Sequence, residues 1–177
     1  MNLHSLLWRL KPRSERIELL RQNLEQSSTV RNRLALSDEL HEAGMFNCEC
    51  DVLGEGLRGA FKDDATLLMR LTQAHLEAGR EAEAEQILAR TPHERSSESQ
   101  QQRALLMARV DAACGRHAEA ESALREQAAR KKSEAPRYHL AKCCMSSGLC
   151  PKSRLLPQVV EQANACCRNK CGAKRNF

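Results

Sequence analysis

Four glycines recur along the chain at nearly equal spacing, and each follows a segment with the apolar pattern of a helix. Gly44, Gly79, Gly115 and Gly148 are separated by 35, 36 and 33 residues. Glycine is the usual residue where a helix ends in a left-handed turn, because it has no side chain to strain that conformation. A period of about 34 residues built from helix pairs is typical of repeat proteins. The spacing therefore predicts helical hairpins that each turn at one of these glycines.

The second and third units also match each other in sequence. Both carry Gly-Arg-x-Ala-Glu-Ala-Glu, at 79–85 and at 115–121. The fifth residue after the glycine is alanine in both units. We therefore expect the second helix of each hairpin to pack closely on its neighbours at this position. The same slot in the four units holds, in order, Glu49, Ala84, Ala120 and Ser153. The outer units are therefore expected to be less regular, as terminal repeats often are.

Composition limits the core and the compartment. Aromatic residues make up 3% of the chain and apolar residues 41%, so the core must be built mainly from leucine, alanine, methionine and cysteine. Residues 1–14 show neither the apolar run nor the small-residue cleavage site of a signal peptide, and no stretch approaches the roughly 18 apolar residues of a membrane span. The nine cysteines are an odd number. These features predict a cytoplasmic protein whose thiols are mostly reduced.

We expect four segments along the chain. Residues 1–13 form a short amphipathic segment closed by Pro12, which can touch a membrane surface weakly or pack on the first repeat. Residues 14–29 hold a helix capped by Ser14, followed by a linker. The repeat array covers residues 30–167, and residues 168–177 form a basic tail.

The expected hairpins follow from apolar periodicity and from helix stop signals. Asp63 or Asp64 is expected to cap the second hairpin. Gly54, Gly56 and Gly59 predict a short or frayed second helix in the first hairpin, because each glycine costs about 1 kcal/mol inside a helix. The expected helix pairs are 30–44 with 46–61, 63–79 with 81–90, 101–115 with 117–132, and 134–148 with 151–167.

A large residue followed by a small one precedes each turn glycine, which lets neighbouring helices approach closely. These pairs are Leu36-Ser37, Leu71-Thr72, Met107-Ala108 and Leu140-Ala141. With the glycine and alanine slots, this pattern resembles the tetratricopeptide repeat (TPR) family over residues 30–167, and the chain is similar to bacterial proteins that carry such repeats. Most aromatic positions of the family are replaced here, and only Phe46 keeps its ring after the turn glycine.

The resemblance implies an all-α fold: an α-solenoid of about four stacked helix-turn-helix repeats with an N-terminal helical extension. In such arrays the first helices line a curved groove that holds an extended peptide or a partner's helix. The chain is then a non-catalytic scaffold or adaptor that binds a protein or peptide partner. The residues that the resemblance places in the groove are Leu34, Asp38, His41, Met69, Gln73, Leu76, Leu105, Arg109, Ala112, Tyr138, Lys142 and Met145.

The charge along that expected groove changes from acidic to basic, and Arg109 and Lys142 are expected to meet carboxylates of the partner. The alternative function is RNA binding by the basic C-terminal half, which also fits the net charge of +5. Few aromatic side chains are available to stack on bases, and the acidic run over 77–85 would repel phosphate, so nucleic acid is the weaker candidate.

Enzymatic and metal functions are disfavoured by the residues present. No phosphate-binding glycine loop or nucleophile elbow occurs, and the histidines lie at different slots of the repeat. Six cysteines gather near the C-terminal end, at Cys143, Cys144, Cys150, Cys166, Cys167 and Cys171. They leave a metal-bound C-terminal lobe as a third alternative, but the Cys-x-x-Cys clip of structural zinc sites is missing. We expect no catalytic residue, no cofactor and no metal.

Overall fold

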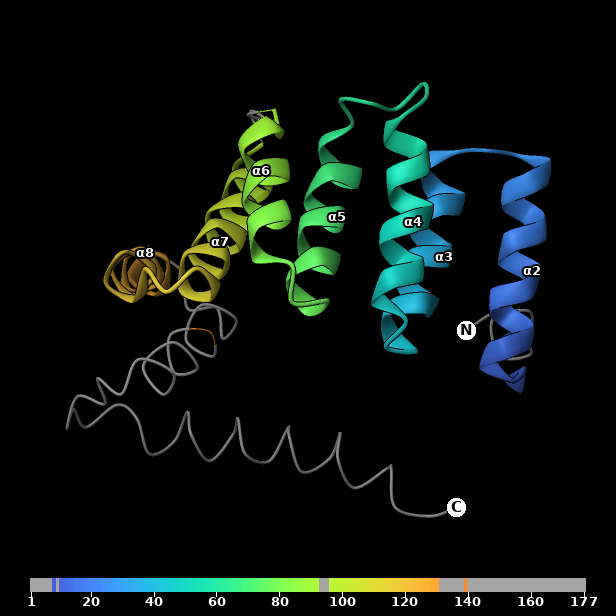
Figure 1. Ribbon diagram of the computed structural model, residues 1–177, viewed down its shortest axis with the longest axis horizontal. Helices are drawn as coiled ribbons and strands as arrows, with labels where there is room; N and C mark the ends of the chain where they lie inside the picture. Colours follow the sequence, from blue (N-terminus) through green and yellow to red (C-terminus); the bar gives the residue numbers. More distant parts are fainter. Residues whose placement is uncertain (1–7, 9, 93–95, 131–138, 140–177) are drawn as a thin grey trace, which may run out of the picture. The chain divides into compact units, whose positions relative to one another are not determined.

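The computed structural model describes residues 8, 10–92, 96–130 and 139, and it divides the chain into two compact units, Met1–Arg95 and Ser96–Phe177. Within the described residues the secondary structure is helical, with no strand. The first unit contains α2 (Arg13–Gln26), α3 (Val30–Glu42), α4 (Phe46–Leu57), α5 (Ala65–Glu77) and α6 (Glu81–Arg90). The second unit contains α7 (Ser97–Ala113) and α8 (His117–Arg130) (Figure 1). Each unit is described by itself below.

The predicted turn glycines end their helices as expected. Gly44, Gly79 and Gly115 have φ angles of 72°, 71° and 82°, in the left-handed region. The amide of the residue after each glycine donates to a carbonyl five residues earlier; the N–O distance from Met45 to Leu40 is 2.9 Å, for example. This is the Schellman arrangement, which satisfies the last carbonyls of a helix. Gly148, the fourth predicted turn, lies outside the described residues.

Consecutive helices of the first unit pack against each other. Contacts join α2 to α3, α3 to α4, α4 to α5 and α5 to α6, and α3 also reaches α5. Figure 1 shows α4, α5 and α6 side by side, with α2 at the opposite end of this unit from α6. The two hairpins α3–α4 and α5–α6 are therefore packed on each other through α4 and α5, with α3 as a further contact.

The two hairpins bury equivalent positions. Except for Cys50, whose equivalent Glu85 is exposed, the buried residues of the first hairpin recur as buried residues 35 positions later in the second. The equivalent pairs are Arg33 and Leu68, Leu36 and Leu71, Ser37 and Thr72, Leu40 and His75, Glu49 and Ala84, Leu53 and Leu88, and Gly56 and Thr91. The predicted packing pairs Leu36-Ser37 and Leu71-Thr72 are thus confirmed as core positions.

The core between the hairpins is small and aliphatic. Cys50 and Leu53 from α4 pack with Leu67, Leu71 and Ala74 from α5. Full burial of a leucine side chain contributes roughly 1.5–3 kcal/mol, so these contacts are a main source of the stability of the junction. As the composition predicted, the buried cluster consists of leucine, alanine and cysteine, and one aromatic ring, that of the partly buried Phe61, packs against it.

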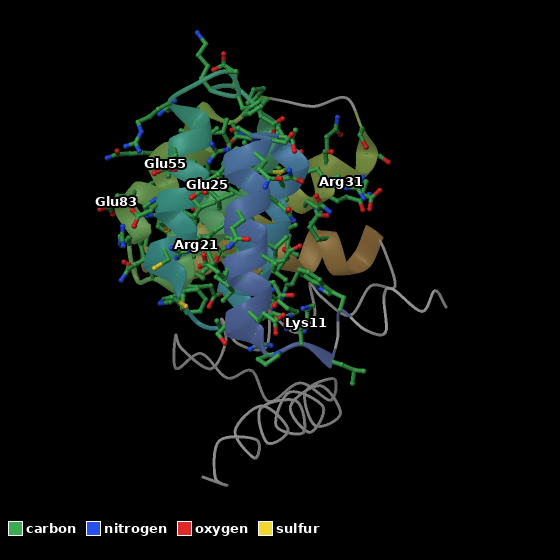
Figure 2. The ribbon with its side chains drawn as sticks, turned by 90° about the vertical axis from the view of Figure 1, so that its right-hand side faces the viewer. Lys11, Arg21, Glu25, Arg31, Glu55 and Glu83 are labelled. Atoms are coloured by element: carbon green, nitrogen blue, oxygen red, sulfur yellow. The ribbon has the colours of Figure 1, made fainter. Side chains whose placement is uncertain are left out.

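Helix α2 is attached to α3 in a different way. None of its residues is fully buried. Two of its arginines form ion pairs with α3: Arg16 with Glu39, with an N–O distance of 2.8 Å, and Arg13 with Glu42, at 2.9 Å. Figure 2 views the molecule from the side of α2, and Arg21 and Glu25 project from this helix into solvent.

The helix starts in the first unit match one of the two caps expected from the sequence. Asp64, one of the two caps proposed for α5, is confirmed, because its side chain accepts from the amide of Leu67 at 2.9 Å. Ser14 is not the cap of α2; the helix begins at Arg13, directly after Pro12, and shows no side-chain cap. The proline ring fixes φ for entry into the helix, so Ser14 already lies inside it.

The expectation of a short or frayed α4 is confirmed at its end and wrong in its interior. This helix stops at Leu57, four residues before the expected bound and ahead of Gly59, yet Gly54 and Gly56 lie inside a regular helix of 12 residues, against 13 in α3. Gly56 is buried inside it, and a Cβ atom built there would lie 2.7 Å from Cδ of Arg33. The glycine thus makes room for the Arg33 side chain, which donates to the carbonyl of Val52 at 2.7 Å. Packing against α3 outweighs the low helix propensity of glycine.

The second unit has a smaller described core. Ala108, Ala120 and Leu124 are buried together where α7 meets α8, which confirms Ala120 as a close contact. Met107 was expected to pack beside Ala108, but it is 41% exposed. The predicted fourth hairpin and the basic tail lie outside the described residues. None of the helices in the described part of the chain has both the length and the apolar character needed to cross a membrane.

Candidate functional site

Six of the predicted groove residues lie in the first unit, on two helices that contact each other. Leu34, Asp38 and His41 are on α3, and Met69, Gln73 and Leu76 are on α5. Asp38 is exposed and the other five are partly buried, with Leu34 packed against the core between the hairpins. The structure therefore brings these six residues onto neighbouring helices.

The other six predicted residues lie in the second unit or outside the described residues. Leu105, Arg109 and Ala112 are on α7, all partly buried, and Leu105 and Ala112 pack against the cluster of Ala108, Ala120 and Leu124. Tyr138, Lys142 and Met145 lie outside the described residues. The predicted change from acidic to basic along the surface therefore stays a prediction.

The most distinctive feature near the first group is a buried carboxylate. Glu49 on α4 has a side chain that is 0% exposed. Its Oε1 accepts a hydrogen bond from Ser37 Oγ at 2.7 Å and another from Arg70 Nε at 3.0 Å. Its Oε2 lies 2.8 Å from Nδ1 of His41. Burying a carboxylate is unfavourable unless it is paired and hydrogen-bonded, and here both oxygens have partners.

Arg70 on α5 links three helices. Besides Glu49 on α4, its Nε donates to Ser37 Oγ on α3 at 3.0 Å, and its Nη2 donates to Asp38 Oδ1 on α3 at 2.6 Å. The Arg70 side chain is 21% exposed and that of Asp38 66%. We call Ser37, Asp38, His41, Glu49 and Arg70 the Glu49 network. Ser37 and Glu49 are fully buried, whereas Asp38, His41 and Arg70 are exposed or partly exposed.

His41 is held from two sides. Its Nδ1 contacts the Glu49 carboxylate, and its ring lies edge-on to Phe46, with ring centroids 5.3 Å apart and an interplanar angle of 69°. An ionised carboxylate oxygen accepts hydrogen bonds and does not donate them, so Nδ1 of His41 is the donor to ionised Glu49.

The Glu49 network does not have the arrangement of a nucleophilic site. Ser37 is fully buried and donates to Glu49. His41 bonds the other oxygen of the same carboxylate and does not bond Ser37, so these contacts do not form a serine–histidine pair. Among the described residues, no group of three or more histidine, cysteine, aspartate or glutamate side chains is placed to hold a metal ion. The network is suited to holding side chains in fixed positions.

The sequence contained a signal for this network that the repeat interpretation missed. Glu49 stands in the slot that holds Ala84 and Ala120 in the next hairpins, and the repeat pattern alone explains it as the irregularity of a terminal repeat. Arg70 likewise replaces Ala35 and Leu106 at equivalent positions. An acidic and a basic residue thus stand in slots that are apolar in the neighbouring repeats. Such a pair of opposite charges in adjacent repeats indicates a buried ion pair.

Two further titratable groups in the first unit are perturbed by burial. Burial lowers the pKa of His75 below its usual 6.5, and the nearby Arg80 adds to this effect while Glu83 opposes it. The buried Nδ1 of His75 has no hydrogen-bond partner. Burial also raises the pKa of the Cys50 thiol to about 11. Both groups therefore favour their neutral forms in the folded protein.

Comparison with known proteins finds no match: no protein-family model, no curated protein and no solved structure resembles the chain at a significant level.

Proposed function

We propose that the chain is a TPR-like array that acts as a non-catalytic adaptor and holds a protein or peptide partner on the surface formed by α3 and α5. The observation that carries this proposal is the recurrence of buried positions at a spacing of 35 residues in the two hairpins of the first unit. The shared geometry of the three turn glycines supports it. Repeats that each bury one face leave the other face for binding.

The side chains available on α3 and α5 fit a mixed polar and apolar partner. Met69 and Leu76 are partly buried apolar residues, and methionine adapts its shape to a bound surface. Asp38, His41 and Gln73 add hydrogen-bonding groups along the same two helices. A few apolar contacts flanked by polar groups are typical of interaction surfaces. This composition supports recognition of a protein or peptide.

We further propose that the protein acts in the cytoplasm, where thiols stay reduced. Cys48 and Cys50 are free thiols only two residues apart on α4. Cys50 is buried and Cys48 is partly buried, which suits the use of cysteine as a small apolar residue.

The proposal is tested by affinity capture with the intact chain and a pair of matched variants. Met69→Glu/Gln73→Glu places two negative charges on the proposed surface of α5, while Ala82→Glu/Ala89→Glu places two on exposed positions of α6. We expect the α5 variant to lose proteins that the wild type and the α6 variant both retain. Identical captured sets for all three would contradict the proposed surface.

Salt separates the protein-binding proposal from the RNA-binding alternative. Nucleic-acid binding falls steeply as salt rises, because phosphate contacts release counterions. Capture through an apolar and hydrogen-bonded surface is expected to change little between low and moderate salt. Captured material that is nuclease-sensitive and lost with salt would favour the RNA-binding function instead.

A further inference from the structure

Glu49 occupies a position where the other described hairpins have a small apolar residue. Ala84 and Ala120 stand at the equivalent position, five residues after their turn glycines, and both are 0% exposed. Glu49 is equally buried but carries a charge. Such a residue is costly in a close-packed slot unless neighbouring groups compensate for the lost water. The identity of those neighbours therefore decides whether the first hairpin is stable.

The compensating cation comes from the next hairpin. Ser37 and His41 belong to α3, within the same hairpin as Glu49, whereas Arg70 belongs to α5. At the position of Arg70 the other three repeats of the sequence have Ala35, Leu106 and His139. The combination of glutamate and arginine in these two slots therefore occurs at one junction of the repeat pattern. This pair of residues therefore distinguishes the packing of α5 on α3 and α4 from the packing at the other junctions of the pattern.

The same contacts reach the surface at two predicted binding residues. Arg70 Nη2 holds the exposed Asp38, and Glu49 holds Nδ1 of His41. Arg70 and His41 contact different oxygens of the same buried carboxylate, Oε1 and Oε2 of Glu49 respectively. One carboxylate thus lies between the α5 arginine and the α3 histidine.

We propose that the Arg70–Glu49 pair couples hairpin stacking to the binding surface: docking of α5 on α3 and α4 fixes the side chains of Asp38 and His41. Arg70 and Glu49 are positioning residues in this scheme, and they act through the two surface residues. The role of that surface in partner binding rests on the proposed function above. The coupling itself is a property of the free chain and is tested without a partner.

The first test is a double-mutant cycle on the full chain, read by chemical denaturation. Arg70→Leu leaves Glu49 buried without its cation, and we expect the folding equilibrium constant to fall about 100-fold or more. Glu49→Ala is expected to cost less, because Arg70 is partly exposed and can reach water. Glu49→Ala/Arg70→Leu recreates residues found in the other hairpins and is expected to recover to within about tenfold of wild type.

Arg31→Leu is the matched control, since Arg31 is an exposed arginine on α3 (Figure 2). It is expected to leave the folding equilibrium unchanged within about twofold. A double variant as unstable as Arg70→Leu would overturn the proposal. So would a double variant whose loss of stability equals the sum of the losses of the two single variants. If Arg70→Leu does not fold, a folded double variant supports the coupling and an unfolded double variant contradicts it.

The second test reads the surface directly by long-range ¹H–¹⁵N spectra of the histidine rings. In the wild type we expect His41 to carry its hydrogen on Nδ1. In Arg70→Lys, which keeps the charge but not the planar fork of donors and leaves Glu49 in place, the ring nitrogen shifts of His41 are expected to change. Unchanged shifts in this variant would overturn the coupling while leaving the proposed binding surface untouched. Arg31→Leu again serves as the control.

Discussion

Single residues of the first unit show where the repeat pattern is modified and at what cost. Gly56 and Gly54 lie in the same helix, yet their surroundings differ: a Cβ atom on Gly56 would meet Arg33 at 2.7 Å, and one on Gly54 would meet nothing within 4 Å. The two glycines therefore make a matched pair for separating packing from helix propensity.

Gly56→Ala is expected to destabilise the protein by about 1–3 kcal/mol, because the added methyl group forces Arg33 out of its position. Gly54→Ala is expected to stabilise it by about 0.5–1 kcal/mol, because alanine is the better helix former. Urea denaturation of both variants measures the two effects. Stabilisation by both substitutions would show that Arg33 moves aside freely.

His75 predicts a dependence of stability on pH. It stands at the core position that Leu40 fills in the first hairpin, and burial lowers its pKa. The unfolded chain therefore binds a proton more readily than the folded chain. The stability associated with neutral His75 is present above pH 6.5 and is lost as the pH falls from there through the lower folded pKa.

We expect His75→Leu to reduce the acid destabilisation of the wild type over this range. The measurement is the free energy of unfolding of both proteins from about pH 8 to about pH 5. The difference between them should grow as the pH falls. Parallel curves for the two proteins would rule out the buried neutral histidine.

Cys50 and Cys48 are expected to differ in reactivity. With a pKa of about 11 in place of 9.0, Cys50 has about 100-fold less of the reactive thiolate at neutral pH. Alkylation of the native protein followed by peptide mass spectrometry should therefore label Cys48 well before Cys50. The two should react alike in denaturant. Equal labelling in the native state would contradict the burial of Cys50.

At the scale of helices and turns, the left-handed glycines control where each hairpin folds back. Gly79 has a φ of 71°, and nothing lies within 4 Å of a Cβ atom built on it. A substitution there meets backbone strain and no steric clash. Gly79 therefore separates the effect of conformation from that of packing.

Gly79→Val is expected to destabilise the protein by about 1–2 kcal/mol or more, because a β-branched residue resists the left-handed conformation. Gly79→Asn is expected to cost less, since asparagine tolerates that conformation better. Thermal unfolding of the two variants gives the order. Equal melting temperatures for wild type and Gly79→Val would show that the turn at this position is not left-handed.

The same elements show how far the sequence predicts the fold. Helix α6 has the predicted bounds, Glu81–Arg90, because a turn glycine and a proline mark its ends. Helix α7 begins at Ser97, earlier than predicted, because its first turn is polar and lacks the apolar periodicity that marks a helix. Helix propensity does not predict that α4 continues through Gly56, because this glycine makes room for the Arg33 side chain of another helix.

The candidate site was predictable only in part. The positions of Asp38 and His41 on α3, and of Met69 on α5, followed from repeat spacing. Their connection through buried Glu49 did not, because a charged residue in a core slot reads as a departure from the pattern until its partner is known. Tertiary contacts between separate helices supply that partner.

At the scale of the molecule, the central claim is that the hairpins of the first unit are stacked in an open row. A closed bundle would instead bring the first and last helices of the unit together. Figure 1 places α2 and α6 at opposite ends of this unit, and the main contacts join consecutive helices. The separation of α2 from α6 therefore distinguishes the two architectures.

The most direct test measures the distance between two spin labels by pulsed electron–electron double resonance. The labels are placed at Arg21 on α2 and at Glu83 on α6, which are both exposed (Figure 2). The labels are attached through unnatural amino acids, because the chain has nine cysteines. Packed helices lie about 8–10 Å apart, so stacked hairpins between α2 and α6 predict a separation above about 20 Å. A distance near 10 Å, typical of neighbours in a closed bundle, would contradict the stacked array.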